Sequence, residues 1–352
     1  MTHTTASPAA IISVRGLRKS FKGRRGKGPV EAVRGIELSV SPGEVFGFLG
    51  PNGAGKSTTL RILSTLLPAD AGEVSIAGFD VRTQPRQVRK QIGYVSQAGG
   101  ADPLATGREN LLLQARLYGL SRTLADRRAA ELIESLGLGE FVDRFAKTYS
   151  GGQRRKLDIA IGMVHNPKIL FLDEPTTGLD PVSRSQLWGQ IRMLRKLGTT
   201  VFLTTHYMEE ADALCERIAI MDHGKIVAEG TPTELKGGIH GDILSLTVNH
   251  VENAPEIALG VLRELDIVRE VKAEGGSLRL VVSRGGEALP VVLRLLEGRG
   301  IGVADIALSR PSLDDVFLRA TGHSLRDEGS VIAAGTAPAL SDTARTASGA
   351  KE

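Results

Sequence analysis

The stretch GPNGAGKSTTL, residues 50–60, restricts the fold of this chain more than any other part of the sequence. It lies between an apolar run, EVFGFL, and a helix-like run, LRILSTLL. Gly50, Gly55, Lys56 and Ser57 match the pattern of a phosphate-binding loop, in which glycines allow consecutive backbone N–H groups to point at one anion. A glycine-rich hairpin turn is the alternative, and the strand before the loop and the helix after it argue against that alternative. The stretch therefore predicts a phosphate site at the start of a helix near Lys56.

The residues of this loop indicate how a nucleoside triphosphate would be held. Lys56 would reach the β- and γ-phosphates, and the Ser57 hydroxyl would ligate Mg²⁺. The positive end of the helix dipole would act at the same point. The predicted nucleotide-binding residues of the loop are Gly50, Pro51, Asn52, Gly53, Ala54, Gly55, Lys56, Ser57 and Thr58.

Two adjacent carboxylates end a second apolar run, KILFLDEP. A buried parallel strand delivers its last side chains, here Asp173 and Glu174, to the carboxyl edge of the sheet, where ligands bind in folds of this kind. Because neighbouring strand residues point in different directions, one carboxylate can bind Mg²⁺, directly or through water, while the other faces a water aimed at the γ-phosphorus. The predicted metal ligand of the pair is Asp173. A strand-to-turn junction capped by acids is the alternative, and the presence of the phosphate loop in the same chain argues against it.

A second glycine-rich helix start lies between the phosphate loop and the carboxylates. The run YSGGQRRKLDIAIGMV at 149–164 places Ser150 as a helix N-cap, followed by Gly151, Gly152 and Gln153. Serine, two glycines and a helix start form a second anion-binding helix end. Taken alone, this run would be interpreted more simply as an ordinary capped helix.

In their order along the chain, these motifs resemble the ATP-binding subunit of an ABC transporter, over about residues 11–235. The Ser150 motif resembles the signature of that family. The resemblance implies an α/β fold, with a P-loop NTPase core and a helical signature subdomain, and it implies ATP and Mg²⁺ as cofactors. It also implies a homodimer in which each signature contacts the ATP held by the phosphate loop of the other subunit. The residues that the resemblance places against ATP in trans are Ser150, Gly151, Gly152, Gln153 and Asp180.

Other positions carry over one by one from the resemblance, which implies Glu174, His206 and Gln97 as catalytic residues. Gln97, in GYVSQ, matches the glutamine that senses Mg²⁺ and water and contacts the membrane subunit. His206, in FLTTH, matches the histidine that contacts the γ-phosphate, and Glu174 would be the general base or would polarise the attacking water. Phe21, in LRKSF, occupies the place of the aromatic residue that stacks on adenine, where tyrosine is commoner. The signature begins with Tyr149, where leucine is commonest.

The pattern of apolar and polar residues along the sequence changes once, near KGGIHGD at 236–242. Before this point, continuous apolar runs alternate with amphipathic helical ones, which predicts parallel strands buried on both faces. In one of the helical runs, Leu187, Ile191, Leu194 and Leu197 form a single apolar stripe that would pack on the sheet.

After this point, residues 242–320 predict a small α+β domain with the element order βαββαβ. This region has no cluster of titratable residues at catalytic spacing, so we expect a regulatory or assembly role. The ends of the chain, 1–10 and 323–352, are rich in small residues and are expected to be flexible.

Composition limits the classes of function. Hydrophobic residues make up 41% and charged residues 24% of the chain, which is typical of a soluble globular protein. No apolar run reaches membrane-spanning length, so we expect a separate permease, with this chain at the cytoplasmic face of a bacterial cell membrane. The net charge of +4 is too small to indicate nucleic acid, and the single cysteine, Cys215, fits a reducing cytoplasm. The basic run at 22–28 is expected to be a solvated loop, with contact to an acidic partner or lipid headgroups as the alternative.

Two further runs resemble particular exporters. ATGRENLLLQARLYGL resembles the helical subdomain of bacterial drug- and polyketide-exporter ATPases, and PSLDDVFLRATGH, at 311–323, resembles the C-terminal element of the daunorubicin/doxorubicin-resistance group. Together they imply export of a drug or polyketide-type antibiotic, with lipid, polysaccharide or an ion as alternative cargo. A non-transport ABC ATPase acting on DNA or ribosomes would require a long coiled-coil insertion or a second ATP-binding unit. A plain P-loop nucleotide kinase would leave YSGGQ unexplained.

Overall fold

A computed structural model describes residues 10–23, 28–249, 254–274 and 277–322 of the chain. The predicted flexible tail, the predicted flexible N-terminus apart from its last residue, and most of the basic run lie outside these residues. Among the described residues, no helix combines the length and the hydropathy needed to cross a bilayer.

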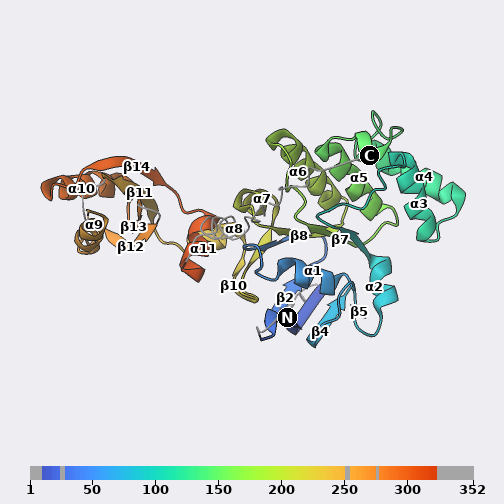
Figure 1. The fold of residues 1–352 in the computed structure, drawn as a ribbon, viewed down its shortest axis with the longest axis horizontal. Helices are drawn as coiled ribbons and strands as arrows, with labels where there is room; N and C mark the ends of the chain where they lie inside the picture. The colour runs from blue at the N-terminus through green and yellow to red at the C-terminus, as the bar shows by residue number, and fades with distance from the viewer. Residues whose placement is uncertain (1–9, 24–27, 250–253, 275–276, 323–352) are drawn as a thin grey trace, which may run out of the picture.

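A six-stranded sheet forms the centre of the main body (Figure 1). Its strand order is β10-β9-β3-β8-β7-β6, and all neighbouring strands are parallel except the edge strand β10. The strands are β3 (Val45–Leu49), β6 (Ile92–Val95), β7 (Ile169–Asp173), β8 (Thr200–Thr205), β9 (Arg217–Asp222) and β10 (Lys225–Gly230). The predicted α/β class with a buried parallel sheet is therefore confirmed.

Side chains along the central strands alternate between two hydrophobic cores, one on each face of the sheet. On one face, the ring of Phe202 packs against Phe46 and Phe171, with centroid distances of 5.4 and 5.6 Å. On the other face, Leu170 and Leu203 belong to the core that the helices α5 (Gly151–Met163), α6 (Pro181–Lys196) and α7 (Met208–Leu214) cover. Continuous apolar strands are needed because both faces are buried.

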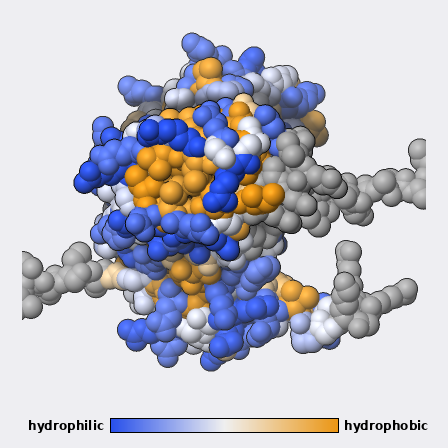
Figure 2. All heavy atoms as spheres, turned by 90° about the vertical axis from the view of Figure 1, so that its left-hand side faces the viewer, coloured by the Kyte–Doolittle hydropathy of each residue, from blue (hydrophilic) through white to orange (hydrophobic). Residues whose placement is uncertain are grey.

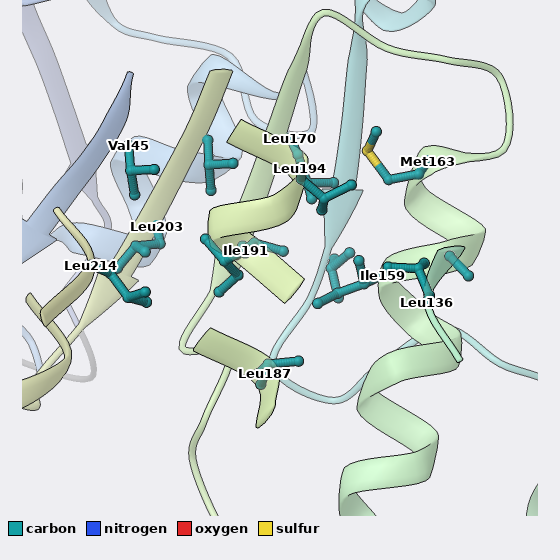
Figure 3. Packing of buried hydrophobic residues seen from close by; sticks show 14 of the residues in the cluster. Val45, Leu136, Ile159, Met163, Leu170, Leu187, Ile191, Leu194, Leu203 and Leu214 are labelled. Carbon is teal, nitrogen blue, oxygen red and sulfur yellow. The ribbon is translucent and has the colours of Figure 1, made fainter. Parts of the chain in front are cut away.

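The helix α6 presents most of the predicted apolar stripe to this core. Leu187, Ile191 and Leu194 are buried, and Figure 3 shows Ile191 and Leu194 on the side of α6 toward Leu170 and Leu203 of the sheet. The prediction was wrong for Leu197, which is 71% exposed. Leu197 is the C-cap residue, so its side chain no longer follows the direction of the helical stripe.

Two smaller layers complete the main body. A second, antiparallel sheet has the order β2-β1-β4-β5 and shares its core with the helix α1 (Lys56–Leu63). Its strands are β1 (Ile12–Phe21), β2 (Val30–Val40), β4 (Ala71–Ile76) and β5 (Phe79–Asp80), and the helix α2 (Pro85–Gln91) follows. The helices α3 (Gly107–Leu117) and α4 (Arg122–Ser135) pack on each other and on α5 at the end of the body where the signature lies.

A small domain extends from the main body beyond the helix α8 (Pro232–Gly237), giving the molecule an elongated shape (Figure 1). Its sheet has the order β12-β13-β11-β14, and its element order is the predicted βαββαβ. The elements are β11 (Asp242–Val248), α9 (Ala254–Arg263), β12 (Val268–Glu274), β13 (Ser277–Val282), α10 (Gly285–Gly298) and β14 (Val303–Ser309). Figure 2, which views the molecule from this end, shows an apolar area bordered by hydrophilic residues.

The last helix, α11 (Leu313–Thr321), returns to the main body. Leu313, Val316 and Phe317 are buried in the same core as α7, and α11 also contacts α8 and β10. Its opposite side faces the small domain, where the carboxylate of Asp315 pairs with Arg279 of β13. Although α11 lies within the range predicted for the second domain, its apolar face belongs to the packing of the first.

Truncating Phe317 should therefore destabilise the main body. Phe317 has no exposed surface, so Phe317→Ala leaves a cavity, and we expect the free energy of unfolding to fall by about 3–5 kcal/mol. The half-exposed Ile257 of α9 provides a control, since Ile257→Ala should cost less than about 1 kcal/mol. Chemical denaturation monitored by the fluorescence of Trp188, which packs against the same core, measures both values. Equal losses in the two variants would contradict the assignment of α11 to this core.

Candidate active site

The phosphate loop runs from the end of β3 to the start of α1, and the helix begins at Lys56 as predicted. Gly55 is the N-cap and has a φ of 106°, a backbone conformation that glycine adopts without strain. A Cβ atom at Gly55 would lie 2.3 Å from the carbonyl oxygen of Ala32 in the adjacent strand β2. Glycine is therefore required here both by the backbone conformation and by the space.

Lys56 and Ser57 lie at the base of this loop. The buried Lys56 ammonium donates hydrogen bonds to the carbonyl oxygens of Gly50 and Pro51, at 2.6 and 2.8 Å. Its Nζ atom also lies 3.9 Å from Oε1 of Glu174. The Ser57 hydroxyl donates to Oδ1 of Asp173 at 3.0 Å. Ser57 and Asp173 are 116 residues apart in the sequence. The fold thus brings the phosphate loop and the carboxylate pair together at one edge of the sheet.

Glu174 lies at the centre of the predicted catalytic residues. Its Oε2 atom accepts hydrogen bonds from the Gln97 amide and the Thr177 hydroxyl, both at 3.1 Å. Its Oε1 atom lies 3.3 Å from Nδ1 of His206, a contact without good hydrogen-bond direction. The backbone of Glu174 has a φ of 45°, a left-handed conformation that is uncommon for residues other than glycine and turns the side chain out of the strand direction. The structure therefore brings Glu174, His206, Gln97 and Lys56 into one cluster.

The neighbouring His206 ring holds the pKa of the Glu174 carboxyl below its ordinary value of 4.5, although burial acts in the opposite direction. The ionised form therefore stabilises the folded chain above pH 4.5, and this contribution is lost as the pH falls from 4.5 through the folded-state pKa. We expect the difference in unfolding free energy between the wild type and Glu174→Gln to become less favourable to the wild type over that range. Denaturation without nucleotide, at a series of pH values, measures this difference. A difference that does not change with pH would show that the folded state does not favour the carboxylate.

Asp173 is held differently from its neighbour. Its Oδ1 atom accepts hydrogen bonds from Ser57 and from the Thr204 hydroxyl, the latter at 2.7 Å. Thr204 lies directly beside Asp173 in the parallel strands β7 and β8, and its hydroxyl accepts a hydrogen bond from the Glu174 N–H at 3.1 Å. As expected from strand alternation, the carboxylates of Asp173 and Glu174 have different partners.

The signature forms the N-terminus of α5. Ser150 is the N-cap as predicted, and it exchanges hydrogen bonds with Gln153 in a capping box: Ser150 Oγ accepts from the Gln153 N–H at 3.2 Å, and Gln153 Oε1 accepts from the Ser150 N–H at 3.1 Å. Tyr149, which departs from the common leucine, donates its hydroxyl to the carbonyl oxygen of Phe141 and packs edge-on against that ring. The extra hydroxyl is thus used inside the helical subdomain, and the Ser150–Gln153 capping box is formed beside it.

The helix ends of the phosphate loop and of the signature do not meet within the chain. Helix α1 packs into the core on one face of the central sheet, and α5 packs into the core on the other. Asp180 is the N-cap of α6, and it accepts from the N–H groups of Val182 and Ser183. Phe21 ends β1 with a partly exposed ring, and the ammonium of Lys19 lies 5.7 Å from its centroid. The side-chain hydrogen bonds of Ser150, Gln153 and Asp180 are made at their own helix starts and to Arg144, and none of them reaches Glu174.

Two threonines of the site were not predicted from the sequence. Thr204 bonds Asp173, and Thr177 bonds Glu174. The available signal was a polar residue at the end of an otherwise apolar strand, in FLTTH, and a second one just after the carboxylates, in DEPTT. Both threonines act by orienting carboxylates, which a spacing pattern does not reveal.

Comparisons with known proteins agree with this geometry. Residues 33–177 match the ABC transporter family model, and residues 230–321 match the model of the C-terminal domain of ATP-binding proteins like DrrA1-3. The daunorubicin/doxorubicin resistance ATP-binding protein DrrA of Streptomyces peucetius is 43% identical over 320 residues, which cover 91% of this chain and 95% of that protein. The human phospholipid-transporting ATPase ABCA7 is 38% identical over 327 residues, which cover 92% of this chain and 15% of that protein.

A solved structure supports the same assignment. It is a dimeric ATP-binding cassette in a post-hydrolysis state with ADP and phosphate, it is 28% identical, and its TM-score is 0.57 over 62% of this chain and 98% of that chain. The phosphate loop, the signature and the carboxylate pair occur here on the fold of such a cassette. The chain therefore belongs to the ABC transporter family as one of its ATP-hydrolysing, ATP-binding subunits, and it is similar to the daunorubicin/doxorubicin-resistance proteins of that family.

Proposed function

We propose that this subunit hydrolyses ATP to energise a separate membrane permease, and that the complex exports a drug or polyketide-type antibiotic. The observation that carries the ATPase part is the buried Glu174 carboxylate, which Gln97, His206 and Lys56 surround beside the phosphate loop. The similarity to a daunorubicin/doxorubicin resistance protein over almost its whole length supports the export of a drug.

In this proposal Glu174 is the general base, or it polarises the attacking water. Its lowered pKa keeps the carboxyl ionised at neutral pH, so that it can accept a hydrogen bond or a proton from water. Gln97 orients the carboxylate through its amide, and His206 and Lys56 place positive or donor groups where charge develops on the γ-phosphate. The buried position of Glu174 limits competing contact with bulk water.

The residues present fit a bound Mg²⁺. Ser57 Oγ and Asp173 Oδ1, a hydroxyl and a carboxylate oxygen, lie 3.0 Å apart, and Mg²⁺ is usually held by few protein oxygens together with phosphate oxygens and water. In the proposed complex these two side chains would hold the ion together with Gln97, and the ion would neutralise charge on the phosphates. Thr204 orients Asp173 for this task.

The second part of the proposal is a head-to-tail homodimer. The signature residues Ser150, Gly151, Gly152 and Gln153 form the start of α5, and Asp180 forms the start of α6. The side chains of Ser150, Gln153 and Asp180 make no hydrogen bond to Glu174 of their own chain. A helix N-terminus attracts phosphate, so in the dimer these residues would contact ATP held by the partner subunit. Phe21 would stack on the adenine of the nucleotide bound by its own chain, since its ring is partly exposed at the end of β1.

The permease contact and the place in the cell follow from the same proposal. The subunit would sit at the cytoplasmic face of the membrane, bound to its permease, with no role in binding nucleic acid. The domain of residues 242–320 would steady the dimer or the permease contact. The apolar area at its end of the molecule is consistent with such a contact, because large exposed apolar areas mark interaction sites.

A phospholipid is the second candidate cargo, because the human phospholipid-transporting ATPase is also a relative. Vesicles that contain the permease and this subunit would be tested with doxorubicin and with a fluorescent phospholipid, and Glu174→Gln would serve as the inactive control. ATP-dependent movement of doxorubicin alone supports the proposal, and movement of the phospholipid alone replaces the cargo. Recovery of DNA or ribosomes, and no small permease, with the tagged subunit from a membrane fraction would overturn the transport function.

A further inference from the structure

One arginine of the signature helix reaches the other side of the active site. Arg155 lies on α5 one turn after the signature, and it is only 6% exposed. Its guanidinium donates to three backbone carbonyl oxygens: Nη1 to Ser96 at 2.7 Å, Nε to Pro175 at 2.8 Å, and Nη2 to Asp173 at 3.0 Å. One side chain therefore ties the signature helix to two separate segments of the sheet edge.

The three carbonyl groups flank two of the predicted catalytic residues. Ser96 directly precedes Gln97, and Asp173 and Pro175 lie on either side of Glu174. The side chains of Gln97 and Glu174 are themselves joined by a hydrogen bond of 3.1 Å. The guanidinium thus fixes the two stretches of backbone from which this pair projects.

A second residue of α5 holds the far end of the Gln97 loop. Asp158, one turn after Arg155 on the same face, accepts hydrogen bonds from the N–H groups of Gly100 and Ala101, at 2.8 and 3.0 Å. The loop fits closely, since a Cβ atom at Gly99 would lie 2.5 Å from a carboxylate oxygen of Asp158. Residues 96–101 are therefore held at both ends by the signature helix, and a shift of α5 would move them as a unit.

The chemistry of the contact requires arginine. The planar guanidinium presents its N–H donors in a fixed fork, so that one side chain can serve three carbonyl groups in three directions. Burial lowers the pKa of Arg155, and the nearby carboxylates of Asp158 and Asp173 act in the opposite direction. A lysine would keep the charge, but its single ammonium cannot reproduce the fork.

We propose that Arg155 is a positioning residue that couples the signature helix to the Gln97–Glu174 pair of its own chain. This inference rests on the proposed head-to-tail dimer. In that dimer, Ser150 at the start of α5 contacts the nucleotide bound by the partner subunit. The other side of α5, through Arg155, sets the hydrolytic pair for the nucleotide bound by its own subunit. When Ser150 contacts the ATP bound by the partner subunit, α5 would therefore position Gln97 and Glu174 to hydrolyse the ATP bound by its own subunit.

The first test compares three variants of the full-length chain. Arg155→Met keeps the bulk and removes the fork, and we expect kcat for ATP hydrolysis to fall by about 30- to 100-fold with KM changed by less than about threefold, because misplacement by about 1 Å can cost about 100-fold. The kcat of Arg155→Lys should lie between that of Arg155→Met and that of the wild type. The control is Lys156→Met, the next residue of α5, which makes no hydrogen bond or ion pair among the described residues, and it should stay within about twofold of the wild type.

The second test separates positioning from folding. If Arg155 acts through Gln97, then Arg155→Met should reduce kcat far less in a Gln97→Ala background than in the wild type, whereas independent effects would multiply. The unfolding temperatures show whether the variants are folded. If Arg155→Met does not fold, the same comparison is made with Arg155→Lys. Multiplicative effects, or an unchanged kcat in a folded Arg155→Met, would overturn the proposal.

Failure of the dimer can be told apart from failure of this inference. The Glu174→Gln variant with ATP reports dimerisation by size-exclusion chromatography and does not involve Arg155. If that variant dimerises and Arg155→Met still hydrolyses ATP at the wild-type rate, the coupling role of Arg155 is wrong, and the proposed function is unaffected. If Glu174→Gln stays monomeric with its permease and ATP present, the head-to-tail arrangement itself falls, and the coupling inference falls with it.

Discussion

Replacing Glu174 with glutamine should lower ATP turnover by at least about 100-fold while the protein still binds ATP. The amide keeps the size of the side chain and its contacts with Gln97 and Thr177, but it cannot accept a proton from water. The phosphate loop, Lys56 and Ser57 are unchanged, so the affinity for ATP should remain within a few-fold. With hydrolysis blocked, nucleotide holds the two subunits together, and the variant should elute as a dimer in ATP and magnesium.

The control for this variant is Glu44→Gln. Glu44 is also a buried glutamate, but it precedes β3 at the end of the strand opposite the phosphate loop, where it accepts from the N–H of Ser41. It should therefore change turnover by less than about twofold, although it removes a buried charge. Turnover by Glu174→Gln at the wild-type rate, measured by phosphate release, would show that another group activates the water.

Much of the fold could be predicted because several kinds of local signal agree. The runs around Phe46, Phe171 and Phe202 are continuously apolar, and only strands buried on both faces require that pattern. The N-cap at Ser150 follows from a side chain that accepts a hydrogen bond from a free N–H group. The start of α1 at Lys56 follows from Gly55, which takes a left-handed backbone conformation at the end of the loop. These predictions depend on contacts between residues close in sequence, so the sequence itself contains the information.

The features that could not be predicted depend on contacts between distant segments. The helix α11 was not among the elements predicted for residues 242–320, and only the folded chain shows Phe317 in the core beside α7. Leu197 continues the apolar stripe in sequence, yet the helix ends at Lys196 and the side chain faces solvent. Hydrophobic periodicity gives the face of a helix, but it gives neither the partner of that face nor the residue at which the helix ends.

In the active site, too, some residues could be predicted from the sequence and others could not. A motif identifies Lys56, Glu174 and His206, because the phosphate loop and the strand ends have characteristic residues. The roles of Thr204 and Arg155 come from bonds that cross between β7, β8 and α5. No spacing rule places an arginine of one helix against carbonyl groups on two strand ends, so such residues are found only in the folded structure.

Replacing Gly55 with alanine should abolish ATP binding, with a loss of affinity of at least about 100-fold. The added Cβ would lie 2.3 Å from the backbone oxygen of Ala32, so either the loop or β2 must move, and the N–H groups that cradle phosphate would move with the loop. Gly53→Ala is the matched control: Gly53 also has a positive φ, 86°, so alanine has a similar backbone strain, but no atom lies within 4 Å of the added Cβ. Titration with a fluorescent ATP analogue should show at most about a tenfold loss for Gly53→Ala, because strain alone costs about 1 kcal/mol. Equal losses in the two variants would mean that strain determines the shape of the loop and that the contact with β2 does not.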